Sequence, residues 1–215
     1  MKKLTLVLLL FAAAGFGCKF FDSLKGGSGG PGVGSGSGGS DPKADVIAAS
    51  RKFTDLKSFS AKMEGIGQTE IKSQVDYVAP DRFRVKYLAG TGSGMEMIMI
   101  GNESFMKTGN NWSKMPGAGN NAVPTLRDSF TEEGLKTLSD VKFEGSDTVD
   151  GKPALMYSYK NVTPQGDFPF NAKIWVGKES GLPMKIVADY TNGVLKQMTI
   201  TYDTETPVTI EPPVK

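Results

Sequence analysis

Apolar and polar residues alternate along most of the chain between residues 59 and 202, and this period of two is typical of β-strands with one buried face. Turn-forming residues, among them Asp150-Gly151 and Asn192-Gly193, separate the alternating runs, so consecutive runs can pair as antiparallel hairpins. The pattern predicts a mainly β fold of about ten or eleven antiparallel strands with α-helices added. The predicted strands span residues 59–63, 71–77, 83–87, 95–100, 104–107, 112–115, 141–149, 154–160, 168–176, 182–191 and 194–202.

Two helices are predicted among these strands. Asp41 can cap a helix, Pro42 suits its first turn, and apolar residues then recur at spacings of three and four through Leu56. A second apolar stripe predicts a helix over residues 124–138, which Gly134 weakens. Each apolar stripe would have to be buried, and an apolar face of the sheet is where it could pack.

The first forty residues are unlike the rest of the chain. Residues 1–17 combine a positive start with an apolar run too short to span a bilayer, which predicts a signal peptide. Cys18 follows directly and is the only cysteine of the chain, so residues 15–18 resemble a bacterial lipobox, which implies acylation of Cys18. The alternative is cleavage after residues 12–14, which would leave a stray thiol.

A tether is predicted between the anchor and the folded domain. Residues 18–40 include the run GGSGGPGVGSGSGGS at positions 26–40, which offers no apolar surface to offset the loss of backbone entropy. The folded domain is expected to span residues 41–215. Lys19 after the cysteine implies a position in the outer membrane facing the periplasm, if the host is Gram-negative.

Composition excludes several classes of function. The chain has no histidine and one cysteine, which excludes Ser-His-Asp and Cys-His catalysis and zinc sites of the His/Cys type. Its 25 basic and 23 acidic residues form no basic cluster, which argues against nucleic acid as a partner. No metal or other cofactor is predicted. Because no other catalytic constellation is present in the sequence, we expect a non-enzymatic protein and a monomer.

Methionines are concentrated on the predicted strands. Nine of the ten lie in the folded domain, and Met95, Met97 and Met99 project from one face of a single strand. They are either ordinary core residues or part of a surface that accepts variable apolar ligands, for which flexible thioethers are suited. A strongly curved sheet could leave such a surface open on its concave face.

Three segments carry a resemblance to a known family. They are YVAPDRFRVKY at residues 77–87, MIMIGNESFMKTGNNWSK at 97–114 and KIWVGKESGLPMKI at 173–186. Residues 42–205 resemble the lipoprotein-carrier superfamily that contains LolA, LolB, LppX, LprG and the N-terminal domain of RseB. The resemblance implies an incomplete antiparallel β-barrel around a hydrophobic cavity, with helices covering the concave face. Ala79 stands where LolA has a lid-latching arginine, so LolB or LprG is the nearer functional analogue.

The predicted function is membrane-anchored, non-catalytic binding or transfer of lipid or lipoprotein acyl chains in the cell envelope. The alternative is an envelope sensor or protein-interaction lipoprotein similar to RseB, with an envelope protein as its partner. Which face of each strand is concave stays open at this point. The candidate cavity residues are Phe83, Val85, Tyr87, Met97, Met99, Phe105, Trp112, Ile174, Val176, Ile186, Met198 and Ile200.

Overall fold

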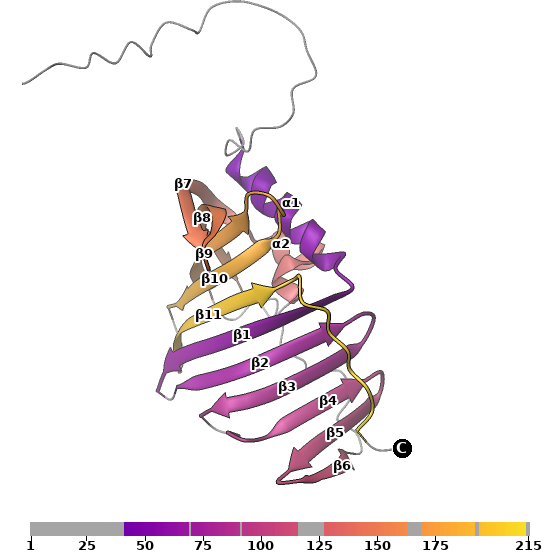
Figure 1. Ribbon diagram of the computed structural model, residues 1–215. Coiled ribbons are helices and arrows are strands. Elements are labelled where there is room, and N and C mark those ends of the chain that lie inside the picture. The colour runs from indigo at the N-terminus through magenta and orange to yellow at the C-terminus, as the bar shows by residue number, and fades with distance from the viewer. Residues whose placement is uncertain are drawn as a thin grey trace, which may run out of the picture. The chain divides into compact units, whose positions relative to one another are not determined.

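The computed structural model describes residues 41–68, 70–90, 92–115, 127–162, 169–191 and 194–213 (Figure 1). The predicted signal peptide, Cys18 and the tether lie outside the described residues. None of the helices in the described ranges has the length and apolar character needed to cross a bilayer. The elements are α1 (Pro42–Thr54), β1 (Ser58–Gly67), β2 (Ile71–Val78), β3 (Arg82–Ala89), β4 (Glu96–Ile100), β5 (Glu103–Thr108), β6 (Asn111–Met115), η2 (a 3₁₀ helix, Asp128–Phe130), α2 (Glu132–Leu135), β7 (Ser139–Val149), β8 (Lys152–Val162), β9 (Pro169–Gly177), β10 (Pro183–Tyr190) and β11 (Leu195–Asp203).

Helix α1 begins where the sequence predicts a helix. The Asp41 carboxylate accepts hydrogen bonds from the backbone N–H groups of Lys43 (3.0 Å) and Ala44 (3.1 Å), which would otherwise lack partners at a helix start. Val46, Ala49 and Phe53 are buried on one side of the helix. The apolar stripe seen in the sequence is therefore the side of α1 that packs on the sheet.

The eleven strands form one antiparallel sheet in the order β6-β5-β4-β3-β2-β1-β11-β10-β9-β8-β7. Each half of the chain contributes a meander, and the pairing of β1 with β11 joins the two meanders in the middle (Figure 1). β6 and β7 are the edges, so the sheet is not closed. The predicted incomplete antiparallel barrel is confirmed as an open eleven-stranded sheet.

Local turn chemistry explains the long β7–β8 hairpin. Asp150 and Gly151 both have positive φ angles, of 49° and 77°, as a two-residue hairpin turn of the favoured hand requires. The predicted turn at Asp150-Gly151 is thereby confirmed. The equivalent signal at residues 192–193 lies outside the described residues.

The helix predicted over residues 124–138 is wrong in its described part, which contains two short helices instead. η2 ends at Phe130, and Thr131 is extended, with φ −72° and ψ 162°. Its hydroxyl accepts a hydrogen bond from the Gly134 N–H (3.3 Å), so Thr131 caps a separate helix, α2. The extended cap and the low helix propensity of Gly134 both oppose a continuous helix.

The two faces of the sheet have different coverings. Partners in adjacent strands share a face, and we call inner the face that carries Val75, Val85 and Ile174, on which α1 packs. The opposite, outer face is polar along its centre and carries two smaller apolar clusters, one in β4 and β5 and one around Trp175 of β9. Ile210 of the C-terminal segment is 1% exposed and covers the cluster of β4 and β5, which includes Ile98 and Phe105.

Candidate functional site

Ten of the twelve candidate cavity residues lie on the inner face. The β2–β3–β4 register pairs Val75 with Val85 and Val85 with Met97, which places Met97 on the inner face. Further along the sheet, Ile174 pairs with Ile186, and Ile186 pairs with Ile200. The ten are Phe83, Val85, Tyr87, Met97, Met99, Ile174, Val176, Ile186, Met198 and Ile200.

The structure does not bring Phe105 and Trp112 to this face. Phe105 pairs with Ile98, the residue between Met97 and Met99, so it points to the outer face. Trp112 packs against the same outer cluster. The physical reason is the two-residue period: a shift of one position in register moves a side chain to the other side of the sheet.

The inner face is fully buried in one part and half-buried in another. Met99 and Ile174 are 1% and 0% exposed in the main core, whereas Met97 on the same strand is only partly buried. Met97 pairs with Met106 of β5. We call the methionine surface the partly buried inner-face set Met63, Met97, Met106, Met115 and Met198.

Small residues lie among the members of the methionine surface. Gly65 pairs with Met198, and Ser73 pairs with Met63. A Cβ at Gly65 would come within 3.3 Å of the Met198 Cε, so glycine leaves this thioether its room. Met95, expected on the same strand as Met97, precedes β4. Met63, Met106 and Met115 were not predicted as site residues. Alternation within each strand would place them on the inner face, but only once the pairing of neighbouring strands is known.

An aromatic row crosses the inner face beside the methionine surface. Phe59 of β1, Tyr77 of β2 and Phe83 of β3 are successive neighbours, with ring centroids 5.2 Å and 4.9 Å apart. Phe53 of α1 contacts Phe59 at 4.8 Å and Tyr202 of β11 also at 4.8 Å. These ring contacts attach the helix to the sheet through apolar area and edge-to-face geometry.

Polar contacts at the ends of α1 accompany this packing. The Tyr157 hydroxyl donates to the Asp45 carboxylate (3.0 Å), and the Lys43 ammonium donates to the carbonyl of Leu138 (2.9 Å). Arg127 donates through Nη2 to the carbonyl of Thr54, the last residue of α1, and through Nη1 to the Tyr77 hydroxyl. The sequence did not indicate Arg127 as a site residue. The helix predicted over residues 124–138 gave no reason to expect a contact between this side chain and α1.

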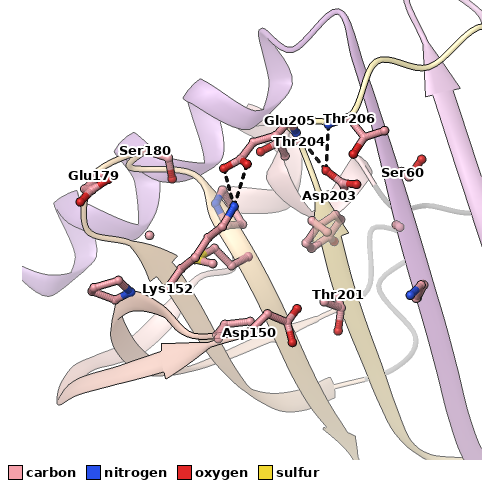
Figure 2. Close-up of a pocket in the computed structure, with 18 of the residues that line it drawn as sticks. Ser60, Asp150, Lys152, Glu179, Ser180, Thr201, Asp203, Thr204, Glu205 and Thr206 are labelled. Carbon is pink, nitrogen blue, oxygen red and sulfur yellow. Dashed lines mark hydrogen bonds and ion pairs between the residues drawn. The ribbon is translucent and has the colours of Figure 1, made fainter.

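A cavity of about 1010 Å³ lies on the outer face (Figure 2). It is bounded by the β7–β8 turn, the β9–β10 turn and the residues that follow β11. Lys152 forms an ion pair with both oxygens of Glu205, each at 2.7 Å, and Asp203 accepts the backbone N–H groups of Glu205 and Thr206, each at 3.0 Å. Lys152 and Glu205 are more than half exposed, so their ion pair contributes little to stability.

The electrostatics of this outer cavity point to no single ligand. The cavity is lined by the hydroxyls of Ser60, Thr201 and Thr206, and by both acidic residues and lysines. In a smaller hollow beside it, the Trp175 indole N–H donates to Asp147 (2.7 Å), and this hydrogen bond is the first cause that lowers the Asp147 pKa. Groups of three or more residues with metal-ligating side chains are absent from the part of the chain that the structure describes.

Comparison with known proteins rests on structure alone. No family model matches the sequence, and no curated protein matches it. The lipoprotein LppX of Mycobacterium tuberculosis superposes with a TM-score of 0.58 at 15% identity, over 79% of this chain and 98% of LppX. LprF of Mycobacterium bovis superposes with a TM-score of 0.59 at 13% identity, over 81% of this chain and 97% of LprF. The resemblance predicted from the sequence is thus confirmed at the level of fold: the chain has the fold of LppX and LprF.

Proposed function

We propose that the folded domain binds acyl chains of lipids or lipoproteins along its inner face, without catalysis, in the cell envelope. The observation that carries the proposal is the methionine surface, which is partly exposed although it continues directly into the buried core. Thioether side chains are flexible and polarizable, so they can repack around apolar ligands of different shapes. Each methylene group that such a surface removes from water contributes about 0.8 kcal/mol.

The shared fold supports the location as well as the ligand. LppX, one of the two superposed proteins, is described as a lipoprotein. Acylation of Cys18 would attach this domain to a membrane, and the Gly/Ser-rich tether would let the inner face reach the lipids of that membrane. The sensor role similar to that of RseB stays the alternative prediction.

A matched pair of substitutions on β4 tests the proposal. Met97 and Met99 lie two residues apart on one face, but Met97 is half-buried and Met99 is 1% exposed. Met99→Trp should lower the free energy of unfolding by about 1–3 kcal/mol through overpacking. Met97→Trp should leave stability nearly unchanged and weaken binding of a fluorescent fatty acid, because the ring occupies the space of the ligand.

The measurements are chemical denaturation and fluorescence titration of each purified variant. Leu88→Trp is the control, since Leu88 is 58% exposed and lies on the opposite side of β3 from Tyr87. It should change neither quantity. A wild-type protein that takes up no fatty acid, or a Met97→Trp variant that binds it unchanged, would contradict acyl binding at this surface.

A further inference from the structure

Two buried side-chain atoms among the described residues have no hydrogen-bond partner, Arg127 Nε and Tyr202 Oη. Leaving a buried polar group unpaired is costly, so native proteins rarely do so without a reason. Both atoms belong to one region: Phe130, whose backbone N–H donates to the Arg127 carbonyl (2.9 Å), contacts the Tyr202 ring at 6.0 Å. The region lies between the aromatic row and the layer made by α1 and η2.

The hydrogen bonds of Arg127 go to neutral groups. Its two hydrogen bonds go to a phenol hydroxyl, that of Tyr77, and to a backbone carbonyl, that of Thr54. The guanidinium carbon lies 4.6 Å from the centroid of the Tyr77 ring. The ion pairs between described side chains do not include Arg127. A guanidinium carries five N–H donors, so Arg127 retains donors, Nε among them, for a further acceptor.

We propose that Arg127 binds the acidic head of an acyl lipid whose chain lies along the methionine surface. This rests on the proposed function and adds the class of ligand to it. A carboxylate or a phosphate would give Nε a hydrogen-bond acceptor. It would also bring a negative charge to the guanidinium. The planar fork of arginine matches the two oxygens of either group.

The apolar neighbourhood of Arg127 distinguishes an acyl lipid from a free anion. Tyr77, to which Arg127 donates a hydrogen bond, contacts Phe83, which is partly buried and lies on the same face of the sheet as Met97. A small hydrated anion gains nothing from an apolar surface, whereas an acyl chain gains from every methylene that it buries against Phe83 and the methionine surface. The ligand class that fits both parts of the site is an acidic lipid with at least one acyl chain.

The test compares a dansyl-labelled fatty acid with its methyl ester, which has the same chain without the charge. Wild-type protein should bind the acid at least about tenfold more tightly than the ester, as expected of a charge-assisted hydrogen bond. Arg127→Met should abolish this preference while keeping ester binding, and Arg127→Lys should retain part of it. Lys173→Met, which removes the same charge from an exposed position on the outer side of β9, should keep the preference intact.

The outcomes separate the two proposals. If the wild type binds neither probe, acyl binding itself fails. If the wild type binds acid and ester equally, acyl binding stands and the assignment of Arg127 is overturned; this comparison needs no variant, so it holds even if Arg127→Met does not fold. Inorganic phosphate is the third probe: displacement of the acid probe by phosphate at equal concentration would overturn the acyl part of the assignment.

Discussion

Asp76 shows how a single polar residue is accommodated on the outer face of the sheet. It is 2% exposed, and its carboxylate accepts hydrogen bonds from Ser60 (2.6 Å), Gln74 (3.1 Å) and Arg84 (2.8 Å). Ser60 and Arg84 are its cross-strand partners in β1 and β3. Burial alone would raise the pKa of Asp76, but the three hydrogen bonds and the charge of Arg84 outweigh it and hold the pKa below its ordinary value.

Replacing Arg84 with Met should lower the free energy of unfolding at pH 7 by on the order of 3 kcal/mol, because a buried carboxylate then loses its positive partner. Urea denaturation of the wild type and the variant measures this difference. The control is Lys86→Met, two residues further along β3, because the ion pair of Lys86 with Glu96 is longer, at 4.0 Å. This change should lower the free energy of unfolding much less. Equal losses in the two variants would contradict the role given to Arg84.

The same pair predicts a dependence of stability on pH. The pKa of Asp76 is lower in the folded protein than its unfolded value of about 3.9, so the contribution of Asp76 is complete above that value and is lost as the pH falls through the folded pKa. The difference in stability between wild type and Arg84→Met should therefore shrink below about pH 4. A difference that stays constant from pH 7 to pH 3 would argue against this ionisation.

At the scale of elements, α1 shows how local and distant interactions combine. Asp41 and Pro42 determine where the helix starts, but isolated helices of this length are marginal in water. Phe53 is 0% exposed and contacts residues of β1, β11 and η2, so tertiary packing supplies most of the stability of α1. The short helices η2 and α2 depend on packing even more, since a single turn forms too few hydrogen bonds to persist alone.

Tyr157→Phe tests the polar attachment of α1 to β8. The change removes the hydrogen bond to Asp45 and should lower the free energy of unfolding by about 1–2 kcal/mol. Burial first, and the hydrogen bond to Asp45 second, raise the pKa of Tyr157, so the hydroxyl stays protonated and keeps donating throughout the physiological range. Denaturation gives the loss in stability, and hydrogen exchange should show it concentrated in α1.

A double-mutant cycle with Asp45→Ala isolates the contribution of this hydrogen bond. The combined loss should be clearly smaller than the sum of the two single losses. Additive losses would mean that Asp45 and Tyr157 stabilise the protein independently of each other.

At the scale of the molecule, the two ends of the domain have different roles. The segment after β11 packs Val208 and Ile210 against the apolar cluster of β4 and β5, and Arg82 donates to the Ile210 carbonyl (2.7 Å). The C-terminal segment therefore covers apolar surface that the outer face would otherwise expose. The predicted anchor belongs to the other end, where Cys18 precedes the Gly/Ser-rich tether.

Cys18→Ser should release the protein from the membrane fraction of its host into the soluble fraction, because the anchoring thiol is removed. Labelling by a radioactive fatty acid should be lost in the same variant. Fractionation and labelling of wild type and variant measure both effects. Unchanged retention in the membrane fraction would contradict lipid anchoring through Cys18 and favour the alternative reading of this residue as a stray thiol.

The sequence by itself determined those features that depend on neighbouring residues. The start of α1, the strands and the turn at Asp150-Gly151 follow from capping, alternation and turn chemistry, and each is found in the structure. The split of residues 127–138 into two helices was missed, although Thr131 and Gly134 both lay in the pattern as local signals against a long helix.

Tertiary structure decided which side of the sheet became the inner face and what lies on it. A period of two shows that Met97 and Met99 share a face, but it cannot show which face a helix will cover. That choice depends on contacts between distant segments: β1 pairs with β11, and α1 packs on the aromatic row. On the outer face, Ile210 packs on the cluster that contains Phe105 and Trp112. Arg127 became a candidate site residue for the same reason, because its hydrogen-bond partners, Thr54 and Tyr77, lie more than forty residues away in the chain.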